Sequence, residues 1–141
     1  MSRIHRLLLA HAKVELQDLV ARHSLSTTVE THSYAFSIFL ENASDYLSIT
    51  YSTHQLDYPY SLDVLYCKQA LIDRSRFLYR TDTKAILSLR RYDQHANLRI
   101  ANSLKEDKML ISDACARACR MFDHFAKLTV LEYKQVQEAY R

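Results

Sequence analysis

The side chains best suited to chemistry in this chain include its three cysteines, Cys67, Cys115 and Cys119. Cys115 and Cys119 are four residues apart, so a helix would place both thiols on one face, with His124 further along the same segment. A structural zinc site needs four ligands, usually in closely spaced pairs, and the chain has no two cysteines separated by two residues. Buried cysteine also packs as a small apolar side chain. We therefore interpret Cys115 and Cys119 as packing residues and predict no metal site.

A nucleophilic cysteine and paired carboxylates are the other candidates for catalysis. Cys67 could act as a nucleophile with a distant histidine as its base, but no local motif supports this role. Glu106 and Asp107 fall in the first turn of a predicted helix, where carboxylates complement the helix dipole. Glycine is absent from the chain, which excludes glycine-rich phosphate loops, dinucleotide fingerprints and nucleophile elbows. We therefore predict no catalytic residue and no cofactor, and favour a binding protein over an enzyme.

The bulk composition is that of one globular domain. The chain has 141 residues, of which 48% are hydrophobic and 25% charged, so residues 1–141 are expected to form a single domain. The apolar runs at residues 7–10 and 38–40 are far shorter than the ~20 residues that span a bilayer. His11 and Lys13 follow the first run at once, so no signal peptide is expected. The odd, low number of cysteines indicates free thiols and favours the cytoplasm.

Hydrophobic spacing predicts the elements that must position these residues. Apolar residues at helical spacing indicate three helices, at residues 2–23, at 61–72 and from 103 toward the C-terminus. Alternation of apolar and polar residues indicates five strands, at residues 27–31, 34–40, 46–52, 77–80 and 85–91. Because the chain lacks glycine, turns with positive φ are expected on Asn, Asp or His, at positions such as Asn42 and Asp82.

The predicted fold class is α+β, an antiparallel sheet of about five strands with flanking helices in the order α-β-β-β-α-β-β-α. The strands at 34–40 and 46–52 are joined by a short polar link, which indicates a hairpin. Ten tyrosines and no tryptophan are present, and most of the tyrosines fall in the sheet half of the chain. Tyrosine is enriched at interfaces. Since Phe36, Ile38 and Phe39 leave both sheet faces partly apolar, we expect helices on one face and a partner on the other.

A basic segment at residues 74–91 offers an alternative function. Its six cations are interleaved with aromatic residues, and they are Arg74, Arg76, Arg80, Lys84, Arg90 and Arg91. Basic and aromatic residues on a sheet can bind single-stranded nucleic acid by charge and stacking. Strand alternation would divide these side chains between two faces, however, and exposed sheet edges commonly carry Lys and Arg.

The element order and hydrophobic pattern resemble the class I type III secretion chaperones, the Tir-chaperone-like family, over most of the chain. Residues 2–8 are similar to the opening helix of that family, and residues 34–40 and 46–51 to its central strands. Residues 62–71 stand at the position of its middle helix, and residues 77–91 resemble its final hairpin, which a long helix follows.

The resemblance implies a cytoplasmic bacterial protein that forms a homodimer and needs no nucleotide. It also implies that an extended N-terminal segment of a secreted effector wraps around the protein, adds to a sheet edge and fills apolar grooves. The expected partner-binding residues lie on the central strands and are Phe36, Ile38, Tyr46, Ile49 and Tyr51. The expected dimer contacts lie on the middle helix and last hairpin and are Leu62, Leu65, Tyr66, Leu87 and Leu89.

Two other hypotheses remain open. A small nucleic-acid-binding or regulatory module would use the segment 74–91 and would bind oligonucleotides in a salt-dependent way. An enzyme would need an unrecognised site, built from Cys67 or the histidines.

Overall fold

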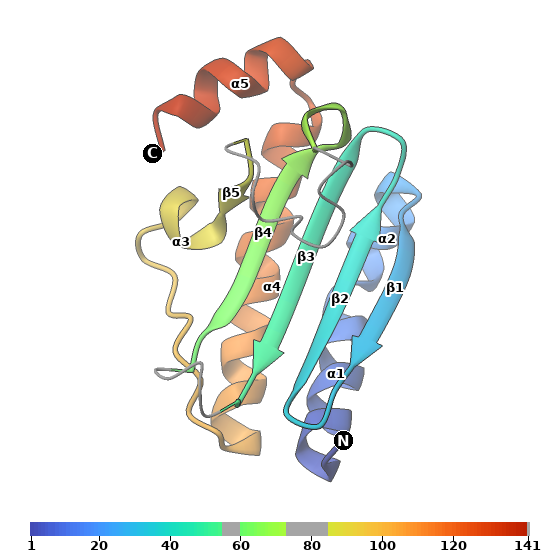
Figure 1. Cartoon of the computed structure of the whole chain (residues 1–141), viewed down its shortest axis with the longest axis vertical. Helices are drawn as coiled ribbons and strands as arrows, with labels where there is room; N and C mark the ends of the chain where they lie inside the picture. The colour runs from blue at the N-terminus through green and yellow to red at the C-terminus, as the bar shows by residue number, and fades with distance from the viewer. Residues whose placement is uncertain (55–59, 73–84, 141) are drawn as a thin grey trace.

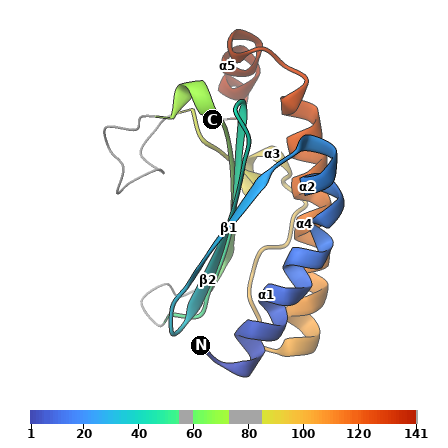
Figure 2. The ribbon, with the colours of Figure 1, turned by 90° about the vertical axis from the view of Figure 1, so that its right-hand side faces the viewer.

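The computed structural model describes residues 1–54, 60–72 and 85–140. Five strands form one antiparallel sheet in the order β1-β2-β3-β4-β5 (Figure 1), which confirms the predicted fold class. The strands are β1 (Ser26–Thr31), β2 (Ala35–Glu41), β3 (Asp45–Ser52), β4 (Leu62–Lys68) and β5 (Leu87–Ser88). The helices are α1 (Arg3–Glu15), α2 (Gln17–His23), the 3₁₀ helix η2 (Gln69–Leu71), α3 (Leu89–Tyr92), α4 (Leu104–Ala126) and α5 (Val130–Glu138). Figure 2 shows α1, α2 and α4 together on one face of the sheet.

The core lies between that face and the helices. In β2, Phe36, Ile38 and Leu40 are buried, and they alternate with residues that are only half-buried. Their partners on β3 are Tyr51, Ile49 and Leu47, and these are buried as well. A strand places alternate side chains on opposite faces, so this register brings six apolar side chains to the face that the helices cover. Small buried residues on the helices, such as Ala12, Ala114 and Ala118, let α1 and α4 pack closely over them.

The expected second helix, at residues 61–72, is wrong, because β4 occupies most of this range. The apolar residues of this range fit a helix and a strand equally well. Leu62, Leu65 and Tyr66 recur at helical spacing, whereas Leu62, Val64 and Tyr66 alternate as in a strand. Pairing with β3 satisfies the backbone hydrogen bonds of these residues and buries Leu62, Val64 and Tyr66. The strand is therefore favoured over the helix. Helical structure is limited to η2 at the end of this range.

The predicted final hairpin is also shorter than expected in its second half. Residues 77–80 lie outside the described residues, and within 85–91 only Leu87 and Ser88 form a strand. Helix α3 follows at once, because the Ser88 hydroxyl accepts a hydrogen bond from the backbone N–H of Arg91 and caps the helix.

Both long helices are interrupted. The first divides into α1 and α2 at Leu16, and the last ends at Ala126 before Thr129 and Glu132 begin α5 with a capping box. In the described part of the chain, the positive φ angles fall on Ser24 and Asn102 rather than on Asn42, and Asp82 lies outside the described residues. Ser24 ends α2 in the left-handed region, where glycine is the usual residue.

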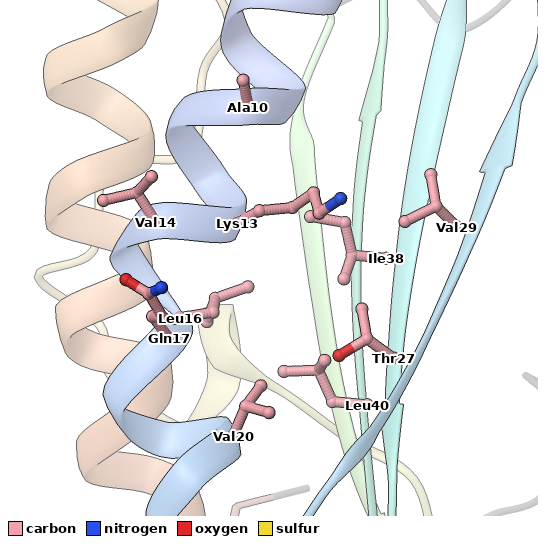
Figure 3. Close-up of a pocket in the computed structure, with 10 residues that line it drawn as sticks. All are labelled: Ala10, Lys13, Val14, Leu16, Gln17, Val20, Thr27, Val29, Ile38 and Leu40. Carbon is pink, nitrogen blue, oxygen red and sulfur yellow. The ribbon is translucent and has the colours of Figure 1, made fainter.

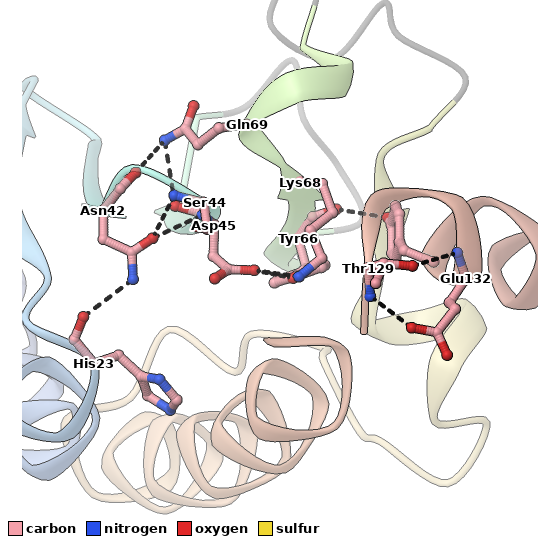
Figure 4. Close-up of polar contacts among 10 residues, drawn as sticks. His23, Asn42, Ser44, Asp45, Tyr66, Lys68, Gln69, Thr129 and Glu132 are labelled. Carbon is pink, nitrogen blue, oxygen red and sulfur yellow. Dashed lines mark hydrogen bonds and ion pairs between the residues drawn. The ribbon is translucent and has the colours of Figure 1, made fainter. Parts of the chain in front are cut away.

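Asn42 nevertheless builds the turn between β2 and β3 (Figure 4). Its side-chain oxygen accepts hydrogen bonds from the backbone N–H groups of Ser44 and Asp45, at 2.9 and 2.7 Å. Its amide nitrogen donates to the carbonyl of His23 at 3.0 Å, which ties the turn to the end of α2. The adjacent Asp45 carboxylate is buried and accepts from the Tyr66 hydroxyl and, at 3.1 Å, from Lys68 Nζ. This end of the sheet is therefore held by paired polar groups.

A second buried carboxylate, Asp107, joins α4 to the sheet. It accepts the Tyr51 hydroxyl hydrogen at 2.6 Å and the backbone N–H groups of Ala101 and Ser103 at 2.8 and 3.3 Å. Burial and the neighbouring carboxylate raise the pKa of Tyr51 well above its usual range, so the phenol stays a donor. Asp107 lies in the first turn of α4, as expected, but its role is to fix the preceding loop and the strand below it.

The Tyr51→Phe variant tests this contact. We expect it to lower the free energy of unfolding by about 1.5–3 kcal/mol, because it removes a buried hydrogen bond to a charged group. Urea denaturation measures the change. Tyr34→Phe is the matched control, since Tyr34 is 57% exposed and its loss of a hydroxyl should change stability by less than about 0.5 kcal/mol. Equal effects of the two variants would contradict the anchoring role of Asp107.

His5 attaches the start of α1 to the ends of β2 and β3. Its Nε2 lies 3.2 Å from the carbonyl oxygen of Tyr34 and 3.0 Å from the Thr53 hydroxyl, and its Nδ1 contacts the Ser2 hydroxyl. A carbonyl only accepts, so Nε2 carries the proton in the neutral ring. Burial lowers the pKa of His5 from 6.5, although the hydrogen bond to Tyr34 opposes that shift.

This pKa shift predicts how stability depends on pH. Between the lowered folded pKa and the unfolded value of 6.5, the unfolded chain binds more protons, so the His5 contribution is complete above 6.5 and falls as the pH falls to the folded pKa. His5→Gln should flatten the change in unfolding free energy just below pH 6.5, measured by urea titration at several pH values. His32→Gln, at an exposed position, should keep the wild-type slope. An unchanged slope in His5→Gln would refute the prediction.

Candidate functional site

The residues predicted to bind a partner lie in the interior. Phe36, Ile38, Ile49 and Tyr51 are at most 1% exposed and face the helices, and Tyr46, on the opposite face, is 3% exposed. The prediction that these side chains offer an open partner surface is therefore corrected: four of them lie on the face that the helices of this chain already cover, and Tyr46 is buried on the other face. Ile38 alone among the five also lines a groove, described below.

Most of the residues predicted to form a dimer interface are also buried. Leu62, Tyr66, Leu87 and Leu89 are buried in the core, and only Leu65 is half-buried, on the opposite face of β4. Tyr66 packs edge-on against Phe122 and Tyr133, at 5.6 and 5.5 Å between ring centroids. Four of the five predicted dimer residues are thus unavailable to a second chain.

The cysteines and histidines form no reactive cluster in the described part of the chain, where no three possible metal ligands come together. Burial raises the pKa of Cys67 to about 12 and that of Cys119 to about 11, and it raises the pKa of Cys115 further. These thiols are therefore protonated at neutral pH and are poor nucleophiles. His124 stacks on Phe125 and contacts the Tyr92 hydroxyl, away from any thiol pair.

The basic segment is only partly described, since residues 74–84 lie outside the described residues. Arg90 and Arg91 are exposed on α3 and border a small hollow of about 250 Å³ beside β4. Asp63 lines the same hollow, which therefore contains both signs of charge.

A larger groove lies between the first two helices and the edge of the sheet (Figure 3). Its volume is about 530 Å³. It is lined by residues of α1, α2 and the turn between them, and of β1 and β2: Ala10, Lys13, Val14, Leu16, Gln17, Val20, Thr27, Val29, Ile38 and Leu40. Most of these side chains are apolar, and Val14 is 65% exposed. Of the lining residues, Ile38 alone was among the partner-binding residues predicted from the sequence.

The groove has two chemically different halves. In Figure 3, Lys13 reaches from α1 toward the sheet and lies level with Val29 and Ile38. Further along, Val20 lies level with Thr27 and Leu40, so this half is lined mainly by methyl groups. Lys13 has no carboxylate partner among the described residues. A single cation therefore stands in a mainly apolar groove.

The walls of the groove are held in place by ion pairs. Arg22 donates to Asp18 at 2.6 Å and to Asp123 at 2.7 Å, and His23 also lies 2.7 Å from Asp123. These contacts raise the pKa of Arg22 and, against the effect of burial, lower the pKa of Asp123. Because Asp123 is on α4, they fix α2 to the central helix.

β1 forms the floor of the groove and also one edge of the sheet, since β2 is its only strand neighbour in the described residues. The backbone N–H of His32 donates to the carbonyl of Ala35, and hydrogen-bonded pairs alternate along an antiparallel ladder. Thr28 and Glu30 therefore bond to β2. The N–H and C=O groups of Thr27, Val29 and Thr31 point away from the sheet.

This edge lacks the usual protection against pairing. Natural edge strands commonly carry lysine, proline or a bulge that blocks another strand. β1 reads Ser-Thr-Thr-Val-Glu-Thr, and its one charged residue is Glu30, whose side chain lies on the face away from the groove. An extended segment could therefore pair with β1 without meeting a charge on the groove side of that strand.

Comparisons with protein-family models, curated proteins and solved structures found no match to this chain. Among the described residues, the search for a helix long and apolar enough to cross a membrane found none.

Amide hydrogen exchange checks the register of this edge. The N–H groups of Thr28 and Glu30 are expected to exchange slowly, since each donates to β2, and those of Thr27, Val29 and Thr31 are expected to exchange much faster. Residue-resolved exchange followed by NMR measures all five. Slow exchange at Val29 with fast exchange at Thr28 would mean that the ladder is shifted by one residue and that the open edge has been assigned wrongly.

Proposed function

We propose that this protein is a non-catalytic binding protein that holds an extended segment of another protein along β1. The observation that carries the proposal is the coincidence of an unblocked strand edge with an apolar groove on one side of it. Strand addition supplies affinity through main-chain hydrogen bonds and specificity through pockets for alternate side chains. Thr27, Val29 and Thr31 offer the hydrogen bonds, and the groove beneath α1 and α2 offers the pockets.

The chemistry of the described residues supports binding rather than catalysis. The buried thiols have raised pKa values, and the two buried aspartates, Asp45 and Asp107, are held by hydrogen bonds within the fold. Lys13 is the only charged group that lines the groove among the described residues. A lone lysine with apolar neighbours can bind an anionic group, but it has no second catalytic group beside it.

A secretion chaperone that holds an effector segment is the particular form of this proposal that the family resemblance suggested. Strand addition to a sheet edge is common to both. One feature of the resemblance, the middle helix, is missing, since residues 62–71 mostly form β4 and η2. The binding proposal does not depend on that helix, because it rests on β1 and the groove.

The test is selection of unstructured peptides from a random displayed library, followed by comparison of two variants. Val29→Pro removes an N–H group that points away from β2, so it should leave the fold intact and block strand addition. We expect it to weaken binding of the selected peptides by more than tenfold, because it removes a central hydrogen bond and places a ring at the edge. Fluorescence anisotropy measures the affinities.

Val29→Ala is the matched control, since it shortens the same side chain and keeps the N–H group. It should lose less affinity than Val29→Pro, and the peptides should slow exchange at Thr27, Val29 and Thr31. Peptides that bind Val29→Pro as well as wild type, or a library that yields none, would contradict the proposed function. Thermal unfolding of both variants verifies that they are folded.

A further inference from the structure

The register of β1 determines where the side chains of an added strand must go. Residues directly opposite one another on neighbouring strands share a face, with their Cβ atoms about 4.5–5.5 Å apart. The side chains of Thr27 and Val29 line the groove. The residues of an added segment opposite these two positions would therefore also enter the space beneath α1 and α2, and the residue between them would point away.

The two halves of the groove are complementary to different side chains. The position opposite Val29 lies level with Lys13, whose ammonium group has no carboxylate partner among the described residues. The position opposite Thr27 lies level with Val20 and Leu40, where a branched aliphatic side chain would replace water against methyl groups.

We infer that the segment held by β1 carries an acidic residue opposite Val29 and, two residues away on the same face, an aliphatic residue opposite Thr27. This inference rests on the proposed function and names the chemistry of the partner. The carboxylate pairs with Lys13 at the rim of the groove, and the aliphatic side chain fills the half beside Val20. The two requirements together define a short acidic and aliphatic motif in an extended conformation.

Charge argues against a second copy of this chain as the occupant. Two β1 strands paired about a twofold axis at Val29 would place valine opposite valine and Thr27 opposite Thr31. Neither position supplies a carboxylate to the groove. The same axis would bring the two Lys13 side chains toward each other, because each lies level with its own Val29. Like charges so placed disfavour the pair, and a foreign acidic segment has no such cost.

Defined peptides test the motif. The probes are labelled peptides of threonine and serine that carry glutamate and valine two residues apart, made in both orders because the strand direction is open. Companion peptides replace glutamate with glutamine or lysine, or valine with alanine. For the wild-type chain in low salt, we expect the glutamate peptide to bind roughly two- to fivefold more tightly than the glutamine peptide, the range of a partly exposed ion pair. The peptide with alanine in place of valine should also bind more weakly than the peptide that carries both glutamate and valine.

Charge reversal gives the decisive comparison. Lys13→Glu should prefer the lysine peptide to the glutamate peptide, which a purely structural role of Lys13 would not produce. Lys134→Glu makes the same change at an exposed position on α5, which does not line the groove, and should keep the wild-type preference.

The outcomes separate the inference from the proposed function. Peptides that slow exchange at Val29 but show no preference for charge, or a preference that Lys13→Glu leaves unchanged, overturn the inference and leave strand addition standing. Peptides that never affect Thr27, Val29 or Thr31 contradict both. A protein that forms a dimer in sedimentation experiments, with Val29→Pro converting it to a monomer, would assign the edge to a second copy and overturn the inference as well.

Discussion

The burial of one face of β2 is the constraint on which the rest of the molecule depends. Phe36, Ile38 and Leu40 must all lie against the helices, and a shift of one residue would turn every one of them to the other face. This requirement fixes the register with β3 and also with β1. It therefore determines which backbone groups of β1 bond inward, and the outward set follows as a consequence.

Polar contacts, one of them buried, then position the helices over that face. Asp107 links α4 to Tyr51 on β3, and Asp123 on the same helix holds Arg22 and His23 of α2. A carboxylate as buried as that of Asp107 is costly to leave without partners, so it favours the one arrangement of its neighbours that supplies them. Because α4 contacts the sheet, the second half of α1 and the end of α2, it helps to fix the position of both helices over the groove.

Much of the fold could be predicted from sequence, and the candidate site could not. β1, β2 and β3 were predictable because alternation and the turn at Asn42 are local signals. Residues 61–72 fit both a helix and a strand, and the choice between them depends on pairing with β3, which is a nonlocal contact.

The partner residues were misplaced for a related reason. The pattern identifies an apolar face such as that of Phe36 and Tyr51, but it does not say whether a helix of the same chain covers it. A threonine-rich strand without lysine or proline, residues 26–31, was the one local signal of the open edge.

The two edges of the sheet differ in a way that makes β1 the one suited to a partner. At the other edge, β5 pairs with only two residues of β4, and the following segment returns to cover the start of that strand. The backbone N–H of Leu62 donates to the carbonyl of Leu98 at 2.7 Å, and that of Ile100 donates to the carbonyl of Tyr60 at 3.0 Å. Such coverage is how natural proteins prevent unwanted pairing. Among the described residues, the chain covers one edge with its own backbone and leaves the other open beside an apolar groove. Stability alone does not require this asymmetry, and the proposed binding of an extended segment along β1 would account for it.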